Sequence, residues 1–235
     1  MGRLPQVKEL VHNCHVWDNP NFIDRFPFKK IEKNPILSNS NLYAKAKITD
    51  LIYTGGIGFS YGSILISDKF KKLLEQFNCF GLQFFSTQII HRNKKIENYW
   101  QTHIYDIPYN FIDFTNTDLL LKDRDENKKS IQKYLEKVSN KEDFLSMIET
   151  MKYPKMLYLK NISFIELMNL DYFFLRNFEG IGNGIVSENL KIEIEKQGIT
   201  GIEFKPIEIS LNDWFGSNGL REKIYGRVSN RRVGV

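Results

Sequence analysis

Cysteine is scarce in this sequence, with only Cys14 and Cys79 among 235 residues. Two cysteines cannot form a disulfide framework, and their separation is not that of a metal-binding pair. A long apolar run is also missing, because the longest uncharged stretch, residues 51–67, is interrupted by four glycines. These absences predict a soluble protein of a reducing compartment, the cytoplasm, without a membrane-spanning segment.

The start of the chain and its charge exclude little. Residues 1–8 contain no apolar stretch typical of a signal peptide, and Gln6 stands where a myristoylation pattern requires Ser or Thr. We therefore expect neither export nor myristoylation. The 33 Lys and Arg residues exceed the 28 Asp and Glu residues and give a formal net charge of +5. This excess is small and spread along the sequence, so it does not decide between classes of partner.

An internal repeat organises the sequence. Residues 66–89 align without a gap with residues 186–209, at a constant offset of 120, and six of the 24 positions are identical. The identical pairs are Ser67/Ser187, Lys71/Lys191, Glu75/Glu195, Gly81/Gly201, Phe84/Phe204 and Ile89/Ile209. Composition alone would produce one or two identities, so the alignment predicts two diverged copies of one structural unit.

The shared positions predict the structure of each unit. Ser67 and Ser187 each follow a short apolar run and precede an acidic residue, which is typical of a strand followed by a helix with a serine N-cap. After each helix, a glycine opens an apolar alternation that predicts a second strand. Phe84 and Phe204 should then be buried in equivalent strands. Each unit is thus predicted to be strand-helix-strand.

The fold class predicted from these patterns is α+β, with the two strand-helix-strand units in mixed sheets and a helical insertion between them. Helical spacing of apolar residues at 131–138 and at 144–151 predicts one bent helix or two short helices there. We expect one compact, two-lobed domain. Its segments are an N-terminal segment at 1–50, a first α/β unit at 51–121, a helical connector at 122–152, and a second α/β unit with a basic tail at 153–235.

Several groups of residues are capable of chemistry, but none has the pattern of a known site. The glycines at 55–58 precede a strand rather than a helix, so a turn is favoured over a phosphate cradle. The remaining candidates are the metal-capable His12, Cys14 and His15, the isolated His91 and His103, the acidic run Asp113, Asp118, Asp123, Asp125 and Glu126, and the basic tail with Arg221, Lys223, Tyr225, Arg227, Arg231 and Arg232. The spacing of the first group matches no zinc pattern, and solvated loops explain the charged runs. We assign no catalytic, metal or cofactor-binding residues and expect no enzyme.

The doubled pattern resembles that of a group of bacterial immunity proteins encoded beside polymorphic toxins. The resemblance is carried by GSILISDKFKKLLEQFNCFGLQFF in the first half and NGIVSENLKIEIEKQGITGIEFKPI in the second. Between them, NYWQTHIYDIPYNFIDF is similar to an aromatic strand leading to an aspartate, here Asp113, and DYFFLRNF to the strand before the second copy. The similar region covers residues 52–209.

The resemblance implies a non-enzymatic protein that binds a cognate toxin, encoded by an adjacent gene, and needs no cofactor. It transfers no toxin-binding residues, and it leaves the oligomeric state open. A basic chain is a poor mimic of nucleic acid, so a nuclease toxin is disfavoured. Two alternatives stay open: a basic nucleic-acid-associated protein, whose affinity would fall steeply with salt, and an enzyme that uses Asp113 or the acidic run.

Overall fold

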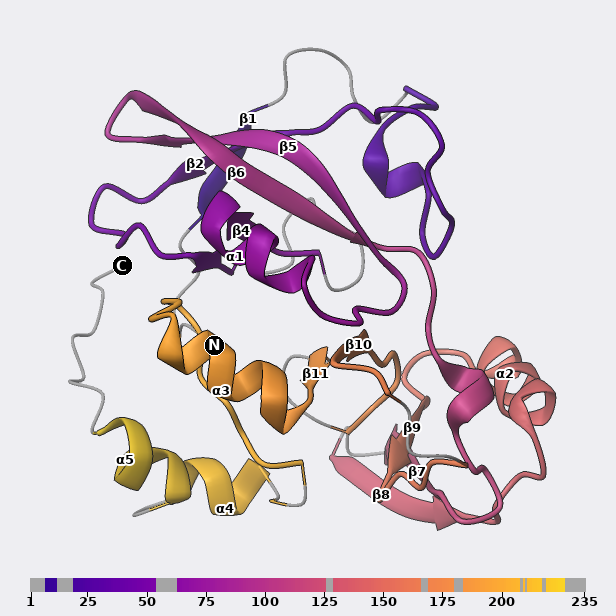
Figure 1. Ribbon diagram of the computed structural model, residues 1–235. Coiled ribbons are helices and arrows are strands. Elements are labelled where there is room, and N and C mark those ends of the chain that lie inside the picture. The colour runs from indigo at the N-terminus through magenta and orange to yellow at the C-terminus, as the bar shows by residue number, and fades with distance from the viewer. Residues whose placement is uncertain are drawn as a thin grey trace. The chain divides into compact units, whose positions relative to one another are not determined.

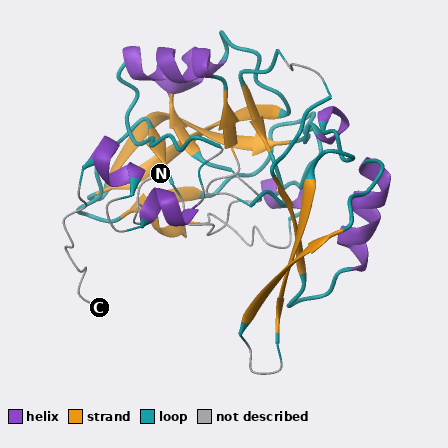
Figure 2. Ribbon diagram, turned by 90° about the horizontal axis from the view of Figure 1, so that it is seen from below, coloured by secondary structure: helices purple, strands orange, loops and turns teal. Residues whose placement is uncertain are grey.

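The computed structural model describes residues 7–11, 19–53, 63–125, 129–165, 169–179, 184–207, 209, 211–216 and 219–226. Helices and strands occur together throughout these residues, which confirms the α+β class (Figures 1 and 2). The chain divides into two compact units, Met1–Ile202 and Glu203–Val235. Each unit is described by itself.

A mixed six-stranded sheet is the largest element of the first unit. Its order is β1 (Val7–Val11), β2 (Asn39–Leu42), β5 (Leu82–His91), β6 (Lys94–Ile104), β4 (Leu65–Ser67) and β3 (Leu51–Ile52). Only β2 and β5 pair in parallel. The long β5–β6 hairpin turns through Arg92 and Asn93, both with positive φ, as a two-residue turn between right-handedly twisted strands requires.

Helix α1 (Asp68–Leu74) packs against β4 and β6 of this sheet (Figure 1). Its apolar face, Phe70, Leu73 and Leu74, is buried. A separate cluster that includes Leu65 and Ile89 forms a core within the sheet strands. The predicted stripe of apolar residues at helical spacing therefore does bury one face of α1.

A three-stranded antiparallel sheet lies between the two serine-capped helices in the sequence. It consists of β8 (Ser130–Leu135), β7 (Asp118–Arg124) and β9 (Met156–Lys160), in that order. Figure 2 shows the β7–β8 hairpin as a long two-stranded ribbon. Helix α2 (Lys141–Thr150) packs on β9. Its fully buried Phe144 contacts the rings of Tyr109 and Phe114 at centroid distances of 5.7 and 5.3 Å.

The remaining elements are short. The 3-10 helices are η2 (Ile23–Arg25) and η3 (Tyr109–Phe111). Strands β10 (Tyr172–Phe174) and β11 (Gly184–Val186) form a two-stranded sheet that leads into α3 (Glu188–Lys196). The second unit holds α4 (Leu211–Phe215) and α5 (Leu220–Tyr225), which are joined by an edge-on contact between Trp214 and Tyr225.

The two predicted N-caps are confirmed. Ser67 Oγ accepts a hydrogen bond from the backbone N of Phe70 at 3.2 Å, and Ser187 Oγ accepts one from Leu190 N at 3.1 Å. In each case the serine hydroxyl donates to an aspartate that lies earlier in the chain, Asp50 or Asp171, at 2.7 Å. The strand, cap and helix of the two predicted units therefore have the same local structure.

The two aspartates also connect the two serine-capped helices, α1 and α3, to each other. The second carboxylate oxygen of Asp50 accepts hydrogen bonds from the backbone N and hydroxyl of Thr200, which follows α3. The second oxygen of Asp171 accepts from the backbone N of Asn78, which follows α1. Each aspartate thus holds the start of one helix and the end of the other, and we call this pair of contacts the aspartate clasp.

Beyond the helices, the two predicted repeats at 66–89 and 186–209 differ, so the duplication is not confirmed. The first repeat continues into β5, whereas residues 202–206 of the second repeat form no strand, and Phe204 is only half-buried. The backbone N of Phe204 donates to the hydroxyl of Tyr225, and Pro206 has no N–H to give to a ladder. Phe84, which lies in β5, is likewise only half-buried. The predicted equivalence of the two phenylalanines is therefore wrong.

The predicted helix at residues 131–138 is also wrong, and with it half of the helical insertion. Residues 130–135 form β8, whose full length pairs with β7. The apolar side chains of this segment fit a strand as well as a helix, and backbone pairing with β7 decides between them. The second predicted helix, at 144–151, is confirmed as α2, which starts earlier because Asn140 caps it through a hydrogen bond from Asp143 N.

Candidate functional site

Several residues singled out in the sequence lie outside the described residues. They are the glycines at 55–58, His12, Cys14, His15, Glu126, Arg227, Arg231 and Arg232. Among the residues that the structure does describe, no group of three or more His, Cys, Asp or Glu side chains is placed to hold a metal ion. Within the same ranges, no helix has the length and apolar character needed to cross a membrane.

The two isolated histidines are held by backbone carbonyls. His103 is buried in β6, and its Nε2 lies 2.8 Å from the carbonyl oxygen of Lys29. Burial lowers the pKa of His103, with the Lys29 contact opposing it, so the ring is neutral near pH 7. His91, at the β5–β6 turn, lies 3.2 Å from the carbonyl oxygen of Ala44. These contacts indicate structural roles for both rings.

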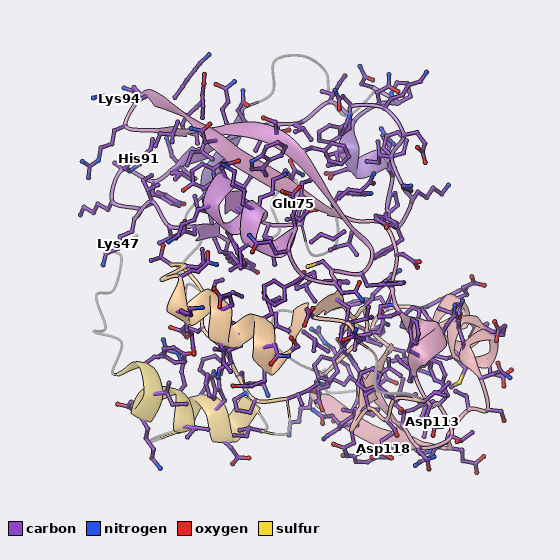
Figure 3. The ribbon with its side chains drawn as sticks, in the orientation of Figure 1. Lys47, Glu75, His91, Lys94, Asp113 and Asp118 are labelled. Carbon is purple, nitrogen blue, oxygen red and sulfur yellow. The ribbon has the colours of Figure 1, made fainter. Side chains whose placement is uncertain are left out.

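Local contacts also engage the aspartates of the acidic run. The Asp113 carboxylate accepts hydrogen bonds from the hydroxyl of Thr115 at 2.6 Å and from the side chain of Asn116 at 2.6 Å, and these bonds lower its pKa. Asp118 accepts from Asn161 at 2.8 Å. Both aspartates are labelled in Figure 3. An aspartate whose oxygens close its own turn is poorly placed to act as a general base.

The basic tail has one buried member. Arg221 of α5 is 4% exposed, and its Nε donates to Glu203 Oε2 at 2.8 Å. This ion pair joins α5 to the segment that precedes α4, and Tyr225 contributes the bond to Phe204 described above. Lys223 is exposed. The described part of the tail is therefore a folded element rather than a frayed end.

The most distinctive surface is one face of the three-stranded sheet. Because side chains alternate along a strand, the register of β7 with β8 and β9 places one set of residues on a common face. We call it the aromatic–basic face, and its members are Asp118, Leu120, Lys122, Arg124, Ser130, Gln132, Tyr134, Met156, Tyr158 and Lys160. Leucines of the opposite face, such as Leu119 and Leu157, belong to the core under α2. The sheet thus has one side in the core and, on the other, an aromatic–basic face whose side chains are half-buried to exposed except for Leu120, which is 1% exposed.

Cations of this face lie over aromatic rings. Lys122 Nζ is 4.9 Å from the ring centroid of Tyr158, and Lys160 Nζ is 5.3 Å from that of Tyr134. Arg124 is 5.7 Å from the ring of Tyr153, a neighbouring side chain that is 75% exposed. Each contact holds a long basic side chain flat against a tyrosine. The face is therefore arranged before any partner binds.

A carboxylate lies within the face. Glu179 pairs with Lys122 at 2.9 Å and with Lys160 at 3.2 Å. Burial alone would raise the pKa of Glu179, but the hydrogen bonds from the two lysines outweigh it and lower that pKa. Hydrogen bonding with Tyr134, supported by Glu179, raises the pKa of Lys160. The centre of the face is therefore a partly neutralised network rather than a uniform positive patch.

A polar cavity lies beside α1 on the six-stranded sheet. It has a volume of about 370 Å³. Its lining residues are Leu37, Asn39, Asp68, Ser86, Thr87, Gln88, Glu97, Asn98 and Trp100. The Trp100 ring carries the ammonium of Lys71 at 4.4 Å, and its Nε1 donates to Asp68 at 3.2 Å. The Trp100 ring and the Asp68 carboxylate in the cavity thus already interact with other side chains of the protein.

Comparisons with models of protein families and with curated proteins gave no match. The resemblance to immunity proteins therefore stays a prediction based on motifs. The function has to be argued from the surfaces that the fold creates.

Sequence reasoning missed the aromatic–basic face. A signal was present, because Lys122 and Arg124 are two residues apart, as are Met156, Tyr158 and Lys160. Alternation of this kind places side chains on one face of a strand. The prediction of a helical connector at 122–152 hid this spacing, because residues two apart do not share a face of a helix.

Proposed function

We propose that the chain is an immunity protein that binds a cognate bacterial toxin in the cytoplasm, blocks it without any catalysis, and uses the aromatic–basic face as its contact surface. The proposal is supported by the composition of that face. Tyrosine, methionine and arginine are enriched at protein interfaces, and tyrosine and arginine are the residues that most often dominate binding energy there. Its described strands, β7, β8 and β9, are not rich in glycine or serine.

The carboxylate at the centre of the face favours a protein partner over a nucleic acid. Glu179 would lie among the phosphates of any strand that lay across Lys122 and Lys160, and like charges repel. In contrast, a protein surface can present a donor to Glu179 and carboxylates to the outer cations. Exposed Tyr134, at 55%, and Met156, at 44%, supply apolar area for such a contact.

The proposal is tested by co-expressing the chain with the product of the adjacent gene, and measuring bacterial growth and co-purification at about 0.5 M salt. Rescue of growth with a complex that survives this salt is expected, since apolar contacts are not screened. Y134A and Y158A together should weaken the complex at least tenfold, the loss of one interface hot spot or more. The matched control is Y43A, because Tyr43 is exposed to a similar extent, 48%, and directly follows β2 of the six-stranded sheet, away from the aromatic–basic face.

Each result has a distinct meaning. A complex that Y134A and Y158A leave intact would show that the toxin binds elsewhere, while rescue would still establish immunity. Neither rescue nor a complex would refute the proposed function itself. Thermal melting of each variant excludes a loss of folding as the cause.

A further inference from the structure

A second surface, independent of the aromatic–basic face, lies at the end of the β5–β6 hairpin. The end of the hairpin, residues 91–96, meets the segment at residues 43–48, which follows β2. Ala44 connects the two segments, because its carbonyl oxygen accepts from Arg92 Nε at 3.0 Å and lies 3.2 Å from His91 Nε2. We call the two segments together the basic tip.

The basic tip concentrates positive charge. Its cations are Lys45, Lys47, Arg92, Lys94 and Lys95, all exposed, and neither segment contains an aspartate or glutamate. These five charges equal the formal net charge of the whole chain, +5, so the rest of the chain is neutral on balance. Figure 3 shows Lys47, His91 and Lys94 at the same end of the large sheet.

Such a cluster is unfavourable for the folded protein alone. Like charges gathered in two adjacent segments repel one another, and salt screens this repulsion over about 8–10 Å. Among the described residues, no carboxylate forms an ion pair with Lys45, Lys94 or Lys95. The aromatic–basic face, in which Glu179 pairs with two lysines, is built differently.

We propose that the basic tip binds the sugar–phosphate backbone of a single-stranded nucleic acid, a function beyond toxin binding. A phosphate backbone offers evenly spaced negative charge, which suits cations on two adjacent segments better than the scattered carboxylates of a protein surface. Tyr43, 48% exposed, lies at the start of the segment at 43–48 and provides a ring on which a base can stack. The two-residue turn holds Arg92 and Lys94 at the end of a long, regular ribbon.

The test measures fluorescence anisotropy of a labelled single strand of about 20 nucleotides, between about 50 and 200 mM salt. With all five cations in contact, the slope of log Kobs against log salt is about −3.5, at roughly 0.7 per phosphate contacted. The double substitution K94E and K95E should make the slope shallower by about 1.4 and lower the affinity at least tenfold. K94Q and K95Q should give the same change in slope with a smaller loss of affinity.

The matched control is K29E with K30E, an adjacent pair of exposed lysines outside the tip. It changes the net charge by the same amount, so an equal loss of affinity would show that overall charge, not the tip, binds the strand. Absence of binding by the wild-type protein at about 50 mM salt would overturn the proposal. So would binding of poly-glutamate in place of the nucleic acid, which would identify an acidic protein as the ligand.

Discussion

At the scale of single residues, the aspartate clasp depends on two carboxylates: Asp50 accepts three hydrogen bonds within the clasp and Asp171 accepts two. Asp50 accepts from Ser67 and Thr200, and both of its oxygens are used. Partial burial raises the pKa of Asp50, but hydrogen bonds from Ser67 and Thr200 outweigh this, and its pKa is lowered. The charged form is therefore the one that the fold stabilises.

Replacement of Asp50 by Asn is expected to reduce the free energy of unfolding by about 1.5–3 kcal/mol, since hydrogen bonds to a charged group are lost. A carboxyl whose pKa is lower in the folded state contributes stability above its unfolded pKa and loses it as the pH falls through the folded pKa. The difference between wild type and D50N should thus be constant from about pH 7 to 5 and shrink below about pH 4. Urea denaturation across this range measures it.

The control for this prediction is Asp106, whose exposed carboxylate accepts only from the neighbouring backbone N of Ile107 at 2.8 Å in the described structure. D106N should change the free energy of unfolding by less than about 0.5 kcal/mol. An equal loss from D50N and D106N would show that the clasp contributes nothing specific.

At the scale of elements, what the sequence reveals depends on how local the signal is. The caps at Ser67 and Ser187 were predictable because an N-cap involves only the next three residues. Strand β8 was not, because its pairing with β7 is a tertiary choice between two patterns that its side chains both fit. The aromatic–basic face and the basic tip were missed for the same reason: each joins strands or turns distant in sequence.

The docking of α2 on the three-stranded sheet depends chiefly on Phe144, which is 0% exposed. Phe144→Ala should lower the free energy of unfolding by about 3–5 kcal/mol, because it leaves a cavity between Tyr109 and Phe114. Guanidinium denaturation measures the change. Ile131→Ala, at a position 47% exposed, should cost less than about 1 kcal/mol and serves as the control. A small effect at Phe144 would contradict the assigned core.

At the scale of the whole molecule, two surfaces of different chemistry lie on different sheets. The aromatic–basic face is partly neutralised by Glu179, whereas the two segments that carry the five cations of the basic tip contain no acidic residue. The affinity of an apolar contact changes little with salt concentration, whereas the affinity of a phosphate contact falls as salt rises. The two proposed functions are therefore separable in a single preparation of protein.

This separation is itself a prediction. K94E with K95E should leave the yield of toxin complex at about 0.5 M salt unchanged, and Y134A with Y158A should leave the salt slope for the single strand within about 0.3 of wild type. Pull-down and anisotropy on the wild type and the two double variants measure both quantities. Loss of both activities in either variant would mean that one surface serves both, contrary to the assignment.

The aspartate clasp is completed late during synthesis. Asp50 and Thr200 are 150 residues apart in the sequence, so the carboxylate leaves the ribosome long before its second partner. At a translation rate of about 5–20 residues per second, the interval is roughly 8–30 s. Through that time the start of α1 has only its own serine as a cap. A chain released early, before residue 200, never completes the contact, and its α1 start lacks the support that the end of α3 provides in the full chain.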